Sequence, residues 1–295
     1  DHMSGGRAIF GSGPGALPSD AFTLGIDPMT QRDRQDEALA VIRRLLAGDD
    51  RFDYESDWFT LKDAKLQLLP LQENLPFAVA SSISPSGMTL AGKHRTGVLS
   101  IGSMSTAGLQ ALPTQWGFAE DSASHHGNQV NRADWRIVMS WHLAETQEKA
   151  EQQAGSGLMR WHNDYTVATL QRPGAQAYDT PALAIQEMAT GEQSAAVIGT
   201  PDDLIIAINK MIALTGGFGT VIGFVHDWAN PKDTANSWDL FARYVVPEIN
   251  GLLDGFRESE AYVKENRAIF ERAGAAVVAK IMENDKAAAA MQEQA

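Results

Sequence analysis

A cluster of serines near residue 80 is the part of this sequence whose residue types and spacing best suit chemistry. The residues of interest are Ser81, Ser82, Ser84 and Gly87. A short apolar run at 77–80 precedes them, while Ser84 suits the N-cap of a helix and Pro85 its first position. Free N–H groups and a partial positive charge make the start of such a helix a place for phosphate. A well-capped turn without a ligand explains the same residues.

A glycine-rich loop follows the first strand candidate. Residues 7–10 form that candidate, and Gly11 and Ser12 open a loop in which the backbone can approach a ligand closely. The segment does not match the dinucleotide-binding fingerprint, because Pro14 and Pro18 prevent a helix from starting at once.

Aromatic and imidazole side chains follow two later strand candidates. Trp141 and His142 end the apolar run 135–141, and His226 and Trp228 follow the run 220–225. In a (β/α)8 barrel such strand ends converge on one active-site face, whereas in a doubly wound sheet they spread along an edge. A buried structural role explains His142 equally well, and His226 and Trp228 can simply cover the end of a barrel. No metal site is expected, because the adjacent His125 and His126 point to different faces of any regular element.

Composition narrows the classes of partner. The 295-residue chain has a net charge of −13 and no cysteine. Acidic charge argues against nucleic acid and anionic membrane surfaces as partners, and the lack of cysteine excludes disulfides, thiolate metal sites and cysteine nucleophiles. No apolar run approaches the ~20 residues of a membrane-spanning helix. A cytoplasmic location is therefore expected.

The order of predicted elements is a repeated strand, loop and helix. Strand candidates are residues 7–10, 77–81, 97–101, 135–141 and 220–225, and helices are predicted at 31–46, 201–214 and 237–253. Short apolar strands without alternation are typical of a buried parallel sheet, in a doubly wound fold or a barrel. We expect residues 1–256 to form the α/β unit, with excursions at 50–70 and 172–195, and residues 257–295 to form a helical tail.

Four segments together resemble the luciferase-like flavin-dependent monooxygenase family. These segments are residues 4–15, 79–87, 197–204 and 216–229, and the last is most similar to the limonene monooxygenase branch. The resemblance implies a (β/α)8 TIM barrel in which the five strand candidates correspond to strands 4–8. Strands 1–3 would be absent, which predicts an incomplete barrel with an unpaired edge on a core strand.

The resemblance also implies a function and a site. A separate flavin reductase would supply reduced FMN or FAD, and O2 would be used to oxygenate an apolar small molecule such as a terpene or hydrocarbon. The cofactor-binding residues would be Gly11, Ser12, Ser81, Ser82, Ser84 and Gly87. His142 would be catalytic, and Trp141, His226 and Trp228 would line the substrate pocket. A homodimer is expected.

Three alternatives remain open at this point. Relatives with this fold use the deazaflavin F420 and transfer hydride instead of oxygen. A non-catalytic flavin-binding partner subunit would show the same segments. A fragment that lacks a third of the barrel would have no activity.

Overall fold

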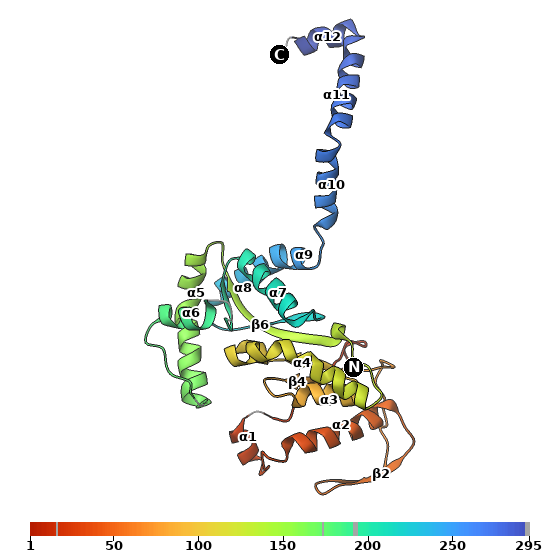
Figure 1. Ribbon diagram of the computed structural model, residues 1–295, viewed down its shortest axis with the longest axis vertical. Helices are drawn as coiled ribbons and strands as arrows, with labels where there is room; N and C mark the ends of the chain where they lie inside the picture. The colour runs from red at the N-terminus through yellow and green to blue at the C-terminus, as the bar shows by residue number, and fades with distance from the viewer. Residues whose placement is uncertain (16, 173, 191–193, 293–295) are drawn as a thin grey trace. The chain divides into compact units, whose positions relative to one another are not determined.

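The computed structural model describes residues 1–15, 17–172, 174–190 and 194–292 (Figure 1). The chain divides into two compact units, Asp1–Phe241 and Ala242–Ala295, and each is described by itself. No helix in the described ranges is both long and apolar enough to cross a membrane.

A parallel sheet forms the centre of the first unit. Its strands are β1 (Phe10–Ser12), β4 (Phe77–Ser81), β5 (Gly97–Ser100), β6 (Trp135–Leu143), β7 (Val197–Gly199) and β8 (Thr220–Phe224). The order is β1-β4-β5-β6, with β8 along the first part of β6 and β7 along its end. Among the described residues, β1 pairs with β4 alone and β8 with β6 alone, so one edge of each strand is open. The predicted parallel α/β architecture is confirmed; β7 was not predicted as a strand.

Helices follow the strands along the chain. They are α1 (Pro18–Thr23), α2 (Gln31–Ala47), α3 (Ser86–His94), α4 (Thr106–His125), α5 (Gln147–Arg160), α6 (Pro181–Ala189), α7 (Pro201–Thr215) and α8 (Pro231–Leu240). A π-helix, Trp161–Thr169, continues α5. The predicted excursion at 172–195 contains α6, which begins with a capping Thr180 before Pro181. Figure 1 shows α3 and α4 side by side, and a Cβ added at Gly92 would lie 2.3 Å from the Ala119 carbonyl oxygen.

The two faces of the sheet have different surroundings. Val79 of β4 packs against Leu39 of α2 and Leu90 of α3, which defines the helix-covered face. The strand register carries this face through Val98 to Trp135 of β6. Because side chains alternate along a strand, Ala80 of β4 and the even-numbered residues of β6 point to the opposite face.

A two-stranded excursion lies between β1 and β4, as the sequence predicted. Strands β2 (Phe52–Glu55) and β3 (Thr60–Ala64) form an antiparallel hairpin. The Glu37 carboxylate of α2 accepts hydrogen bonds from the Tyr54 hydroxyl at 3.0 Å and from Trp58 Nε1 at 2.6 Å. These two contacts fix the hairpin to α2.

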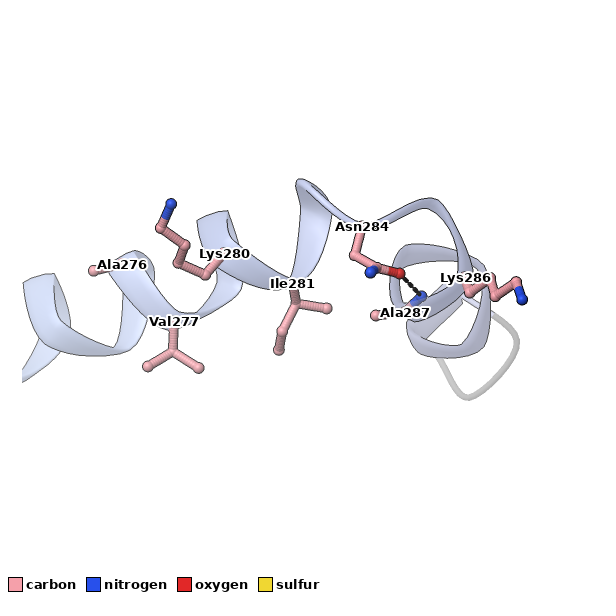
Figure 2. Close-up of a pocket in the computed structure, with 7 residues that line it drawn as sticks. All are labelled: Ala276, Val277, Lys280, Ile281, Asn284, Lys286 and Ala287. Atoms are coloured by element: carbon pink, nitrogen blue, oxygen red, sulfur yellow. Dashed lines mark hydrogen bonds between the residues drawn. The ribbon is translucent and has the colours of Figure 1, made fainter.

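The second unit, Ala242–Ala295, is helical where the structure describes it, and it begins before the helical tail predicted at 257–295. Its elements include α9 (Val246–Ile249), α10 (Asp254–Glu265), α11 (Arg267–Met282) and α12 (Asp285–Gln292). The helix predicted at 237–253 is interrupted, since a π-helical turn, Phe241–Val245, precedes α9, which holds Pro247 in its first turn. A shallow pocket lies at the turn between α11 and α12, where Asn284 accepts a hydrogen bond from the Ala287 N–H (Figure 2). Its lining is mainly aliphatic, with two lysines, Lys280 and Lys286.

Candidate functional site

The turn from β4 to α3 contains the predicted serine cluster, but its helix begins later than the sequence suggests. Pro85 occupies the N-cap position and Ser86 is the first helical residue. The predicted cap, Ser84, does not accept a backbone N–H; its Oγ lies 2.8 Å from Ser86 Oγ instead. The prediction that Ser84 caps α3 is therefore wrong.

The consequence is a helix N-terminus that no side chain caps. Backbone hydrogen bonding in α3 begins with the Thr89 N–H, which donates to the Pro85 carbonyl at 2.9 Å. The N–H groups of residues 86–88 precede this first bond. Ser82 and Ser84 are exposed beside them, while Ser81 is buried at the end of β4. Open N–H donors and two exposed hydroxyls in one turn form a suitable receptor for an anion.

Gly87 holds this turn against the sheet. A Cβ added at Gly87 would lie 2.5 Å from the Ala80 carbonyl oxygen and 3.0 Å from Ser81 Cα. A larger residue would push the first turn of α3 away from the end of β4. Gly87 thus brings the free N–H groups next to the strand terminus, which is a structural contribution to the predicted binding element.

The end of β1 lies at the same edge as the serine turn. Gly11 and Ser12 pair with Ala78 and Val79 of β4 in parallel register. Ser12 Oγ accepts a hydrogen bond from Gln35 Nε2 at 3.0 Å. An added Cβ at Gly11 would have nothing within 4 Å, so the strand is open there. The structure therefore brings the six predicted cofactor-binding residues to the carboxyl ends of two adjacent strands.

A second cluster lies at the carboxyl ends of β6 and β8. His226 Nε2 is hydrogen bonded to Ser140 Oγ at 2.9 Å. The imidazole stacks on Trp228, with ring centroids 4.0 Å apart, and lies 4.6 Å from the Phe224 ring. Trp161, the first residue of the π-helix, meets the imidazole edge to face at 5.2 Å. His226 and Trp228 are thus brought together as predicted.

Sequence reasoning missed three members of this aromatic cluster: Ser140, Phe224 and Trp161. The register of β6 and β8, which pairs Ser140 with Phe224, could identify two of them once the strands are aligned. Trp161 carries no comparable signal, because it reaches the cluster through a π-helix that periodicity does not predict.

Burial controls the charge of His226. Desolvation lowers its pKa to about 4, against a smaller opposing effect of Asp227. The imidazole is therefore neutral at neutral pH, and it shares a hydrogen bond with a hydroxyl instead of carrying a charge into an aromatic environment.

His142 has a different environment from His226. It is buried, and its Nε2–H donates to Gln153 Oε1 of α5 at 3.0 Å. Burial lowers the pKa of His142, opposed by the Gln153 hydrogen bond and by Asp233. In the described ranges, none of these ring contacts and hydrogen bonds joins His142 to the aromatic cluster around His226.

Trp141 lies on the helix-covered face of the sheet. Its indole packs against Trp238, at 4.9 Å between ring centroids, and against Phe241, at 4.8 Å. Gly223 makes room for this packing, because an added Cβ would lie 2.3 Å from both the Trp141 and the Trp238 rings. The predicted substrate residue Trp141 is thus separated by the sheet from Ser140 and His226.

A cavity of about 800 Å³ lies among β6, β7, α4 and α7. Leu109, Met139 and Met211 are among its apolar lining residues, and Ser103 and Lys210 are among the polar ones. None of the predicted site residues lines this cavity. Ser140, the hydrogen-bond partner of His226, also lines this cavity.

Comparisons with known proteins find relatives among monooxygenases. Residues 1–216 match the family model described as luciferase-like monooxygenase. The chain is 41% identical over 278 residues to 4-hydroxyprotoasukamycin monooxygenase of Streptomyces nodosus subsp. asukaensis, covering 93% of this chain and 74% of the relative. It is 40% identical over 252 residues to limonene 1,2-monooxygenase of Rhodococcus erythropolis, covering 85% of this chain and 63% of that protein.

Solved structures show the same fold. Monooxygenase RslO1 from Streptomyces bottropensis superposes with a TM-score of 0.69 at 22% identity, covering 84% of this chain and 71% of that one. The oxygenating constituent of 3,6-diketocamphane monooxygenase from Pseudomonas putida, in complex with FMN, superposes with a TM-score of 0.64 at 23% identity, covering 83% of this chain and 72% of that one. An F420-dependent secondary alcohol dehydrogenase gives a TM-score of 0.59 at 17% identity, covering 82% and 70%.

Proposed function

Because the chain belongs to the luciferase-like monooxygenase family, we propose that it uses reduced FMN and O2 to oxygenate an apolar small molecule. Two relatives at 40% identity or more are named monooxygenases, and one of them is named for limonene, an apolar substrate. The chain spans 63% of the limonene enzyme. The activity that we propose is therefore that of a whole protein of this kind.

The observation that carries the proposal is the open N-terminus of α3. No side chain caps this helix, and the exposed Ser82 and Ser84 lie beside its free N–H groups. The FMN phosphate, with a charge of about −2 near pH 7, is an acceptor of the type that such a turn binds. The open edge at Gly11 supplies space next to this turn for the rest of the cofactor.

The protein's own residues would bind, orient and exclude water. Reduced FMN, when bound, supplies the two electrons that allow one atom of O2 to enter the substrate and the other to leave as water. Trp161, Phe224 and Trp228 offer an apolar wall for the substrate, around the neutral His226. The His226–Ser140 pair can hold a proton near this wall without introducing a charge. His142, whose ring N–H is hydrogen bonded to Gln153, would join β6 to α5 instead of exchanging protons.

A separate flavin reductase is part of the proposal. The glycine-rich segment after β1 does not form a dinucleotide-binding fingerprint, so the chain has no evident nicotinamide site of that type. Reduced flavin would then arrive from another protein.

Reconstitution tests the function directly. The purified protein is supplied with reduced FMN, reduced FAD or reduced F420, with a panel of terpenes and hydrocarbons, and oxygen uptake and oxygenated product are measured. Substrate-dependent product with reduced FMN is expected. Product formation without O2 from reduced F420 would replace the proposal with hydride transfer. Flavin binding without product, on every substrate of the panel, would favour a non-catalytic subunit.

A further inference from the structure

A buried amide on α4 reaches the proposed phosphate turn from behind. The Gln115 side chain is 2% exposed. Its Nε2 donates to the Ile83 carbonyl at 2.9 Å, and its Oε1 accepts from Ser81 Oγ at 3.5 Å. One side chain thus binds the end of β4 and the middle of the exposed segment that follows it.

The turn has few other attachments. The Ile101 N–H donates to the Ser81 carbonyl at 2.8 Å, which fixes the strand end. Beyond it, Ser84 and Ser86 bond to each other within the turn. Gln115 attaches this segment to another element, because its side chain hydrogen bonds to the Ile83 carbonyl from α4.

Burying the Gln115 amide costs free energy unless its polar atoms are hydrogen bonded. Leu112 and Trp116, on the same helix, are fully buried around it. An amide in such surroundings destabilises the fold unless it is hydrogen bonded, whereas an apolar residue of similar size would pack there without that penalty. The contacts to Ser81 and Ile83 compensate for burying Gln115 and at the same time restrict the turn.

We propose that Gln115 is a positioning residue of the cofactor site. It holds residues 82–85 so that Ser82, Ser84 and the first N–H groups of α3 converge on a phosphate, which Gln115 itself does not touch. This inference rests on the proposed function, because the ligand of the turn is taken to be the phosphate of FMN.

The test compares two variants of α4. Gln115→Met removes both hydrogen bonds at nearly constant length and helix propensity. Ser122→Ala is the matched control, since the buried Ser122 hydroxyl donates to the Thr89 carbonyl at 2.7 Å and so joins α4 to α3 without touching the turn. Dissociation constants for FMN and for riboflavin, which lacks the phosphate, are measured by fluorescence titration.

Gln115→Met is expected to weaken FMN binding about tenfold and to leave riboflavin binding unchanged. A tenfold change in the dissociation constant is the size expected for the loss of about one hydrogen bond. Ser122→Ala is expected to keep the wild-type preference for FMN even if it lowers the melting temperature. An unchanged preference for FMN in Gln115→Met would overturn the inference, as would an equal loss in both variants.

Hydrogen exchange in the absence of flavin separates this inference from the proposed function. Gln115→Met should speed amide exchange at residues 82–84 and 86–88 relative to wild type, and Ser122→Ala should not. If wild-type protein binds riboflavin as tightly as FMN, the proposed phosphate site is contradicted, and exchange still decides whether Gln115 holds the turn. Unchanged exchange in Gln115→Met would overturn the inference by itself.

Discussion

Two strand-to-helix turns of this protein have similar sequences, but the helix N-terminus is capped in one and uncapped in the other. After β4 the chain reads Ser84-Pro85, and after β7 it reads Thr200-Pro201. Thr200 caps α7, and its own N–H donates to Asp203 Oδ2 at 2.8 Å, so the two residues form a reciprocal capping box. The turn before α3 has no such cap. One helix start is closed by the protein, and the other is left open to a ligand.

The residue three positions after Ser84 or Thr200 explains the difference. After Thr200 it is Asp203, whose carboxylate completes the box. After Ser84 it is Gly87, which has no side chain and is held against the Ala80 carbonyl. A cap residue followed by proline predicts where a helix starts; the residue three positions later decides whether its N–H groups remain available.

Gly87→Ala should have the largest effect on this comparison. The added methyl would lie 2.5 Å from a backbone oxygen, so α3 must shift from β4, at a cost of about 1–3 kcal/mol in unfolding free energy. The preference for FMN over riboflavin should disappear as well. Gly117→Ala on α4, where an added Cβ has no neighbour within 4 Å, is the control and should stabilise the protein by up to about 1 kcal/mol. Urea titration measures the unfolding free energies of both variants. Equal stability of Gly87→Ala and wild type would show that the close approach of Gly87 to the Ala80 carbonyl is unimportant.

Ser84→Asp should close the open turn with a carboxylate. A negative charge at the start of α3 would satisfy the free N–H groups and repel a phosphate, so FMN affinity should fall about tenfold or more. Riboflavin affinity should stay near the wild-type value, and the melting temperature should not fall. Equal FMN binding by Ser84→Asp and wild type would place the phosphate elsewhere.

Thr200→Ala should open the closed turn at the expense of stability. Loss of the N-cap is expected to reduce the unfolding free energy by about 1 kcal/mol. Because this turn is not part of the proposed cofactor site, the ratio of FMN to riboflavin affinity should remain unchanged. A changed ratio would show that the two turns are coupled.

Replacing His226 should have the smallest effect of these changes, and it should appear in the pH dependence of the unfolding free energy. Its folded pKa of about 4 lies below the value of about 6.5 for an unfolded chain, so the unfolded state binds the proton more readily between these values. Stability should therefore fall as pH decreases from about 6.5 towards about 4, and His142 contributes with the same sign. His226→Phe should make that decrease shallower in denaturant titrations at several pH values. An unchanged slope would contradict the burial of this imidazole.

The sequence was informative about the sheet and less so about its ligand-facing details. Apolar strand runs predicted five of the parallel strands, whereas β7 was not recognised. Trp141 and His142 are neighbours in sequence, yet they lie on opposite faces, because strand alternation separates them. Their faces follow from the pairing register, which the sequence alone does not specify.

The site residues that sequence reasoning missed make contacts with residues that are far away in the sequence. Gln115 contacts Ile83 across 32 positions, and Ser140 contacts His226 across 86. No local pattern marks such residues, because their contacts depend on how strands and helices assemble. Cap and turn chemistry, by contrast, is local, and it located both helix starts to within two residues.

If the start of α3 is an open phosphate site, the protein should distinguish FMN from riboflavin, and one pair of titrations measures this. Wild-type protein is titrated with FMN and with riboflavin, in low and in high salt. FMN should bind at least about tenfold more tightly than riboflavin, and added salt should reduce this difference in affinity. Equal affinities for the two flavins would contradict a phosphate site at the start of α3.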